Sequence, residues 1–108
     1  MLKVYTSIYR YNGPNRLDIT VKTGDRIFAP TWKMVMQSKA GKLSQQEYAA
    51  MYYSLMRDSY VKNKQRWVEV LNMDQVVLVC FCPKETFCHR LLLADILTKL
   101  GAEYLGEI

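Results

Sequence analysis

All three cysteines and the single histidine of this 108-residue chain lie between positions 80 and 89, with an arginine directly behind them. The stretch reads CFCPKETFCHR: Cys80 and Cys82 precede a short polar segment, and Cys88, His89 and Arg90 follow it. Thiols, an imidazole and a guanidinium can together form a metal site, a nucleophilic site or an anion-binding site. The spacing of these residues therefore has to decide between three kinds of chemistry.

Counting excludes two familiar thiol motifs. A tyrosine-phosphatase loop needs a cysteine, five residues and then an arginine, but the sixth residue after Cys82 is Cys88. A thioredoxin-type motif needs two residues between its cysteines, and neither the Cys80–Cys82 nor the Cys82–Cys88 spacing provides this. A zinc site would find suitable ligand types in the three thiols and His89. However, Cys88 and His89 are adjacent on an expected helix and diverge by about 100°, so we expect neither a metal nor a cofactor.

The apolar residues and capping residues in and around this segment predict its strands and helix. Residues 75–82, QVVLVCFC, are continuously apolar, which is typical of a central strand with helices on both faces of a parallel or mixed sheet. Thr86 is a suitable N-cap for a helix over about 87–100, Gly101 is its C-cap, and residues 102–108 supply a final short strand. This order predicts a C-terminal βαβ unit with a right-handed crossover.

The remainder of the chain predicts two further strands, at 2–8 and 17–21, separated by the turn signal NGPNR. Ser44 and Glu47 form a capping box that begins a helix over about 45–60. One side of this helix carries Tyr48, Met51, Tyr52, Leu55, Met56 and Tyr60.

Two shorter helices are expected before and after this long one. The first has Trp32, Val35 and Met36 at helical spacing, and the second would bury Trp67, Val70 and Leu71. Residues 1–108 thus predict a single small α/β domain, with a three- or four-stranded mixed or parallel sheet flanked by helices.

The composition of the chain indicates in which compartment the protein resides and which partners it can have. No run of about 18 apolar residues exists, which excludes a transmembrane helix, and the N-terminus lacks the apolar core of a signal peptide. We therefore expect a cytoplasmic protein with no membrane partner and with reduced thiols, and the odd number of cysteines also argues against a disulfide scaffold. The net charge of +5 favours anionic partners, although solubility alone would also explain it.

The segment also predicts where a site would lie. Cys82 ends a strand, and in open α/β sheets ligands bind outside the carboxyl ends of strands. The free amides at a helix start favour anions and lower the pKa of a thiol placed there, and the planar fork of Arg90 suits phosphate or carboxylate. We expect Cys80 to be a buried core thiol, and His89 and Arg90 to be functional.

The stretch VVLVCFCPKETFCHRLLLADIL resembles the Domain of Unknown Function 488 family. That family typically has a hydrophobic strand that ends near a cysteine, then a short loop, Cys-His-Arg and a Leu-Leu-Ala-type helix. The matching positions here are Cys82, Cys88, His89 and Arg90.

A weaker match to the same family is the first strand and its turn, which would bring Ser7 and Arg10 to the carboxyl edge of the sheet. Small proteins that resemble this one also occur in bacteriophages. The resemblance implies an α/β fold and a polar site around Cys-His-Arg, and it implies no particular reaction.

Our first hypothesis is a site that binds, and could process, a small anionic, nucleotide-derived ligand. The helix start and Arg10 would hold phosphate, and an aromatic ring would stack on a base. The expected ligand-binding residues are Ser7, Arg10, Tyr11, Cys82, Thr86, His89 and Arg90. The aromatic residues considered for stacking are Tyr5, Tyr11, Phe28 and Trp32.

The alternative is an enzyme, a hydrolase or transferase that acts on a nucleotide or a glycosidic substrate. Cys88 or Cys82 would be its nucleophile, His89 its acid or base, and Arg90 its clamp for negative charge. It ranks second because adjacent helical residues usually point apart, so whether the chain is an enzyme stays open.

A third class is nucleic-acid binding. Basic residues such as those in VKNKQR would support it, but no recognised nucleic-acid motif is present. The apolar residues of YAAMYYSLMRDSY allow a homodimer surface, although core packing explains most of them.

Overall fold

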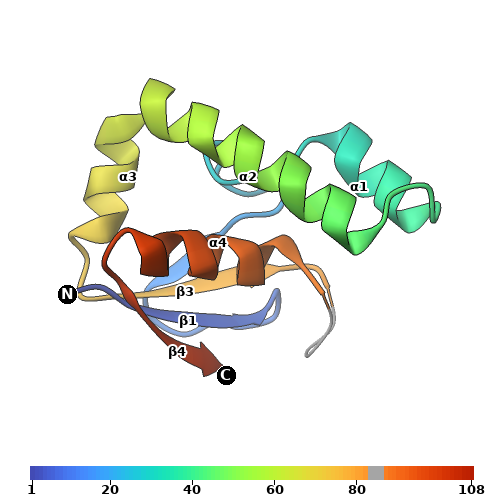
Figure 1. The fold of residues 1–108 in the computed structure, drawn as a ribbon. Coiled ribbons are helices and arrows are strands. Elements are labelled where there is room, and N and C mark those ends of the chain that lie inside the picture. Colours follow the sequence, from blue (N-terminus) through green and yellow to red (C-terminus); the bar gives the residue numbers. More distant parts are fainter. Residues whose placement is uncertain (83–86) are drawn as a thin grey trace.

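The computed structural model of the protein describes residues 1–82 and 87–108. Within these residues the chain forms four strands and four helices (Figure 1). In chain order they are β1 (Lys3–Ile8), β2 (Arg16–Asp18), α1 (Trp32–Lys39), α2 (Gln45–Lys62), α3 (Lys64–Leu71), β3 (Gln75–Cys80), α4 (His89–Lys99) and β4 (Glu103–Glu107). None of these helices has the length and apolar character that crossing a bilayer requires.

The four strands form one parallel sheet in the order β2-β3-β1-β4. The predicted α/β class and four-stranded sheet are therefore confirmed. β3, α4 and β4 form the C-terminal βαβ arrangement only loosely, because β1 lies between β3 and β4. Since all strands are parallel, their carboxyl ends meet at one edge, where Ile8 is paired with Cys80.

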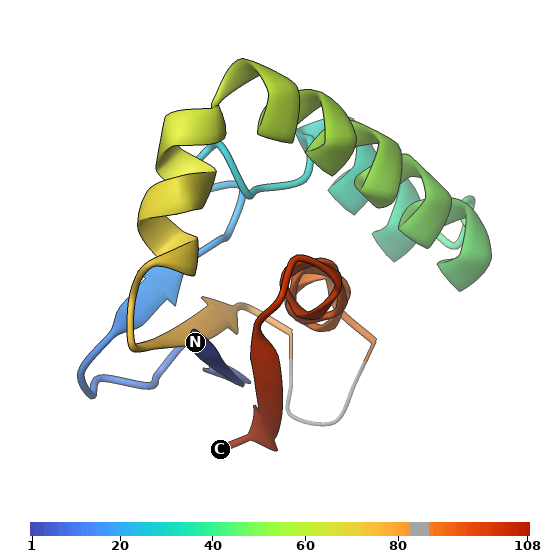
Figure 2. The same ribbon diagram turned by 60° about the vertical axis from the view of Figure 1, so that its left-hand side comes forward.

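The helices lie on one side of the sheet, which corrects the expectation of helices on both faces (Figures 1 and 2). α4 packs against β1, β3 and β4, and α2 packs on α4. Val76 and Leu78 of β3 join the core beneath the helices. The alternate residues Val77 and Val79 face the other side and are also buried, so the continuous apolar run correctly indicated burial of both faces without a second helical layer.

The predicted start of α2 is confirmed, whereas its end and the boundaries of other elements differ from the prediction. Both hydrogen bonds of the Ser44–Glu47 capping box are present, and α2 continues to Lys62 rather than ending near residue 60. β2 is shorter than predicted because the Asp18 carboxylate accepts the amide of Thr20 and the hydroxyl of Thr23, which turns the chain away from the sheet. In α1, Met34 is the buried residue, whereas Trp32 and Met36 are mainly exposed.

Two expectations change where α4 begins. The helix starts at His89 with Cys88 as its N-cap, so Phe87 lies before the helix. The predicted N-cap, Thr86, lies outside the described residues. The apolar side of α2 is mostly used by the chain's own core, because Tyr48, Tyr52 and Met56 are buried in it. The homodimer stays an untested prediction.

Candidate functional site

Cys88, His89 and Arg90 lead from the N-cap into α4, and each of their side chains takes a different direction at the carboxyl edge of the sheet. Cys88 turns toward Cys80 at the end of β3, His89 reaches the segment after β2, and Arg90 reaches the end of β4. All three side chains are buried. The start of α4 is thus fixed to three separate parts of the sheet edge.

The three sulfur atoms gather at one point. The Sγ atoms of Cys80, Cys82 and Cys88 all lie within 4.8 Å of one another. The structure pairs Cys80 with Cys88 as a disulfide and leaves Cys82 as a thiol, in contrast to the expected three reduced thiols. Cys80 is buried as predicted, but it belongs to this cluster rather than to an inert part of the core.

Arg90 holds the cluster in place. Its Nε donates to Oε1 of Glu107 at 2.8 Å and its Nη2 donates to Oε2 at 3.0 Å, a two-point ion pair. Its Nη1 donates to the Cys80 sulfur at 2.9 Å and to the carbonyl of Cys82 at 3.3 Å. Arg90 has no exposed surface. It therefore links α4 to β3 and β4 and does not face solvent as a phosphate clamp, which corrects its predicted role.

His89 is held as a neutral ring of defined tautomer. Its Nε2 lies 2.7 Å from the carbonyl oxygen of Ile19, which can only accept, so Nε2 carries the proton. Nδ1 is then an acceptor, and it lies 3.5 Å from the sulfur of Cys88. Burial, with the nearby charge of Arg90, lowers the pKa of His89 to about 4, against the opposing effect of the Ile19 hydrogen bond.

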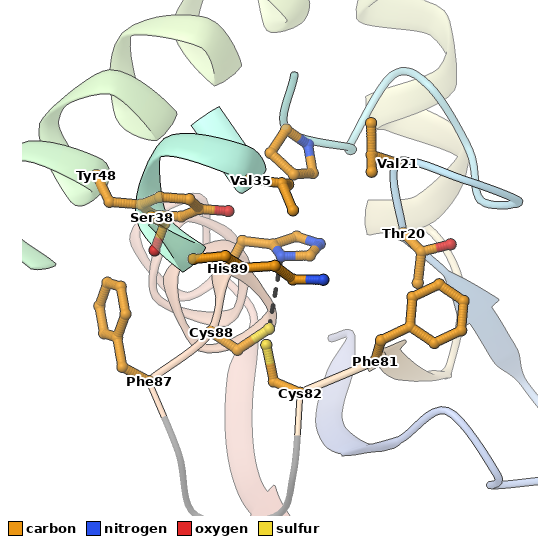
Figure 3. A pocket seen from close by; sticks show the side chains of 12 residues that line it. Thr20, Val21, Val35, Ser38, Tyr48, Phe81, Cys82, Phe87, Cys88 and His89 are labelled. Atoms are coloured by element: carbon orange, nitrogen blue, oxygen red, sulfur yellow. Dashed lines mark hydrogen bonds between the residues drawn. The ribbon is translucent and has the colours of Figure 1, made fainter. Parts of the chain in front are cut away.

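A pocket of about 130 Å³ opens beside these residues (Figure 3). Its walls come from the segment after β2, from α1 and α2, and from both sides of the sulfur cluster. Aromatic rings dominate it, with Phe87 on one side of the sulfur atoms of Cys82 and Cys88 and Phe81 on the other. The lining residues are Thr20, Val21, Pro30, Val35, Ser38, Lys39, Tyr48, Phe81, Cys82, Phe87, Cys88 and His89.

The pocket keeps its titratable groups uncharged, with the exception of Lys39 at its exposed side. Burial raises the pKa of the Cys82 thiol, and the charges of Arg90 and Lys39 only partly oppose this. Burial also raises the pKa of Tyr48. At neutral pH the pocket thus presents protonated thiol, phenol and neutral imidazole.

Some predicted site residues lie in this pocket and others do not. Cys82, Cys88 and His89 line it. Ser7 is buried and donates to the carbonyl of Ile108, so it supports the chain end. Tyr11 donates to the carbonyl of Pro14 within its own turn, and Arg10, which follows β1, is exposed and does not line the pocket.

None of the four predicted base-stacking residues lines the pocket. Phe28 is fully buried against Trp67, and Trp32 is exposed on α1. The rings that do line it are Tyr48, Phe81 and Phe87. Phe81 and Phe87 lie inside the Cys-His-Arg stretch, so their place in the sequence could have indicated that they belong to the site. No sequence spacing indicated that Lys39 lines the pocket or that Glu107 is the partner of Arg90.

The first prediction concerns the buried ion pair. Glu107→Gln removes the charge that balances Arg90, and an uncompensated buried charge is costly, so the free energy of unfolding should fall by about 3 kcal/mol. Glu103→Gln, an exposed position on the same strand, should change it by less than about 0.5 kcal/mol. Urea unfolding of both variants makes the comparison. Similar losses in the two would contradict the role given to Arg90.

The second prediction concerns pH. The pKa of His89 lies near 4 in the fold and near 6.5 in the unfolded chain, so the unfolded state takes up the proton first as the pH falls. Stability from the neutral ring is complete above pH 6.5 and is lost toward pH 4. From pH 7 to pH 5, the wild type should lose about 2 kcal/mol more unfolding free energy than His89→Gln. Urea titrations at both pH values measure this, and equal losses would rule it out.

Comparison with known proteins supports the resemblance carried by the Cys-His-Arg segment. A family model described as the active DUF488-N3 subclade matches residues 3–101, from the start of β1 to the glycine after α4. Neither the curated proteins nor the solved structures provide a match. Since the family model spans nearly the whole fold and includes the sulfur cluster, His89 and Arg90, the chain belongs to the Domain of Unknown Function 488 family.

Proposed function

We propose that the protein binds a small anionic, nucleotide-derived ligand in the pocket at the carboxyl edge of the sheet. The observation that carries this proposal is the pocket wall itself. Three aromatic residues, Tyr48, Phe81 and Phe87, share it with Lys39. Mostly apolar pockets with a few polar groups are the usual form of a small-molecule site, and this combination suits a flat ring that carries a negative group.

The size of the pocket limits how such a ligand would sit. Typical ligand pockets have volumes of roughly 300–1,000 Å³, whereas this one measures about 130 Å³. It would take a single ring, and the charged part of the ligand would remain at the open side with Lys39. Phe81 is 55% exposed and already stacks on Tyr9, with ring centroids 4.3 Å apart, so it offers a ring face at the entrance.

Charge supports the same orientation. The chain carries a net charge of +5, which favours anionic ligands. Arg90 would contribute through its field rather than by direct contact, because its donors are directed to Glu107, Cys80 and Cys82. The sequence predicted that Arg10 and Arg90 would bind the anion. In this proposal Lys39 takes that role.

The third prediction tests the pocket with a panel of mononucleotides, dinucleotides and nucleotide sugars, measured by thermal shift and titration calorimetry. For the best ligand, Phe81→Ala should raise the Kd about tenfold, since stacking on an aromatic ring contributes roughly 1–3 kcal/mol. Lys39→Gln should raise it about two- to fivefold, as expected for an exposed ion pair of roughly 0.5–1 kcal/mol.

The matched controls are Trp32→Ala and Lys42→Gln, an exposed aromatic and an exposed lysine that do not line the pocket. Both should leave the Kd unchanged. Failure of every panel member to bind would refute the proposal. Binding only to random oligonucleotides, with a steep loss of affinity as salt rises, would favour the nucleic-acid alternative instead.

The contact between Cys88 and His89 favours a second candidate function, the thiol- and histidine-dependent enzyme. Nδ1 of His89 is an acceptor 3.5 Å from the Cys88 sulfur, so it can receive the thiol proton as the sulfur attacks. The reaction would be hydrolysis or transfer on a nucleotide or glycosidic substrate. The subclade's description as active supports this candidate. It needs Cys88 free of Cys80, which suits the reducing cytoplasm in which we place the protein.

The fourth prediction separates this enzyme from a binding protein. If Cys88 and His89 act together, Cys88→Ser should abolish turnover in the reduced protein. His89→Gln should lower kcat by about 10²- to 10⁴-fold, the usual contribution of a general base. Chromatography of products from nucleotides and N-glycosides gives the measurement, with the exposed Ser54→Ala on α2 as the control. Turnover that survives both site variants would contradict the assignment.

A further inference from the structure

The cluster of three sulfur atoms is not explained by ligand binding in the pocket. Cys82 and Cys88 line the pocket, whereas Cys80 lies behind them at the end of β3 and is buried. Its sulfur atom is nevertheless bonded to that of Cys88 and lies within 4.8 Å of that of Cys82. Three thiols from two different elements, a strand end and a helix N-cap, therefore converge on one point.

The spacing of these sulfur atoms is close to that of metal ligands. Zinc–sulfur bonds of about 2.3 Å place the sulfur atoms of a tetrahedral site about 3.8 Å apart. The three sulfur atoms lie within 4.8 Å of one another, and those of Cys80 and Cys88 are bonded to each other as a disulfide. A phosphine or thiol reductant breaks this bond and leaves two thiols, and small side-chain rotations are then enough to close the cluster around an ion.

The backbone of Cys80 and Cys88 leaves room for a shared centre once their disulfide is reduced. The Cα atoms of Cys80 and Cys88 are 7.7 Å apart, beyond the range of roughly 4.4–6.8 Å that is usual for disulfides. In the reduced protein, this backbone separation suits two sulfur ligands on either side of one ion.

The surroundings supply a hydrogen-bond donor to one of the three sulfur atoms. Nη1 of the buried Arg90 donates to the Cys80 sulfur at 2.9 Å, and a hydrogen bond of this kind stabilises and orients a sulfur ligand. Its ion pair with Glu107 fixes the guanidinium in that position. The pocket provides a path by which an ion could enter, because Cys82 is only half buried.

The sequence argument against zinc assumed that His89 would be a ligand beside Cys88. The three sulfur atoms do not need it, since His89 donates from Nε2 to Ile19 and remains a neighbour of the cluster. We propose that Cys80, Cys82 and Cys88 bind one thiophilic metal ion of the zinc class as thiolates, with a fourth coordination position open toward the pocket. Three protein ligands and one open position are the arrangement typical of reactive rather than purely structural zinc sites.

The fifth prediction tests this site without reference to any activity. Metal-free protein, kept reduced by a phosphine, is titrated with Co²⁺ and then with Zn²⁺ in competition with a chromogenic chelator. We expect one equivalent of Co²⁺ with sulfur-to-cobalt charge-transfer absorption, its displacement by Zn²⁺, and protection of all three thiols from alkylation. Cys82→Ser should weaken Zn²⁺ binding at least tenfold, and it should leave the fold intact because this side chain is only half buried.

The matched control is Ser54→Ala, at an exposed serine of α2 that does not line the pocket, which should bind Zn²⁺ like the wild type. Less than one equivalent of metal in the reduced protein, or equal affinity in Cys82→Ser, would overturn the proposal. A Cys80–Cys88 disulfide that persists under the reductant would overturn it as well. The inference does not rest on nucleotide binding, because the nucleotide panel is measured on metal-free protein and can fail or succeed separately.

Discussion

The arrangement of the carboxyl edge depends on one buried interaction, the two-point ion pair between Arg90 and Glu107. A guanidinium with no exposed surface is costly to bury unless every donor direction is used. Among the described residues, Arg90 also donates to the Cys80 sulfur and the Cys82 carbonyl, and these contacts tie α4 to β3 as well as to β4. Together with the Cys80–Cys88 disulfide, this side chain fixes the position of the sulfur cluster relative to the helix start.

The backbone at the start of α4 explains how the adjacent residues Cys88 and His89 come into contact. Side chains of neighbouring helical residues normally diverge, but Cys88 is the N-cap, with extended backbone, and only His89 begins the helix. The change of backbone conformation between them brings the Cys88 sulfur to Nδ1 of His89, while Ile19 holds the other nitrogen. A neutral imidazole with an acceptor directed at a thiol is compatible with catalysis. The same cluster, closed around an ion, would instead present a metal to the pocket. Both states use the thiols, so they would exclude each other at Cys88.

Much of the fold could be read from local patterns. The capping box at Ser44, the apolar run of β3 and the Cys-His-Arg segment each reflect interactions within a few residues, and all three have counterparts in the structure. Errors arose where long-range packing decided the outcome. Phe28 and Trp32 both looked available for stacking, yet Phe28 packs against Trp67, 39 positions away, while Trp32 points to solvent. Arg90 looked like an anion clamp because its partner Glu107 lies on a strand that no local pattern connects to it.

The sequence by itself determined the α/β class and the family, and it pointed to the carboxyl end of β3 as the place of a candidate site, because periodicity and a short motif encode these properties locally. Only the tertiary structure decided which side chains share that site. It placed Phe81 and Phe87 on either side of the sulfur atoms, brought Lys39 to the pocket from α1, and took Arg90 out of contact with solvent. It also brought Cys80, Cys82 and Cys88 together as a group of three sulfur atoms, with Cys80 and Cys88 paired as a disulfide. The physical reason is that parallel strands bring distant segments to one edge, and the contacts made there depend on the balance of burial and charge across the whole chain.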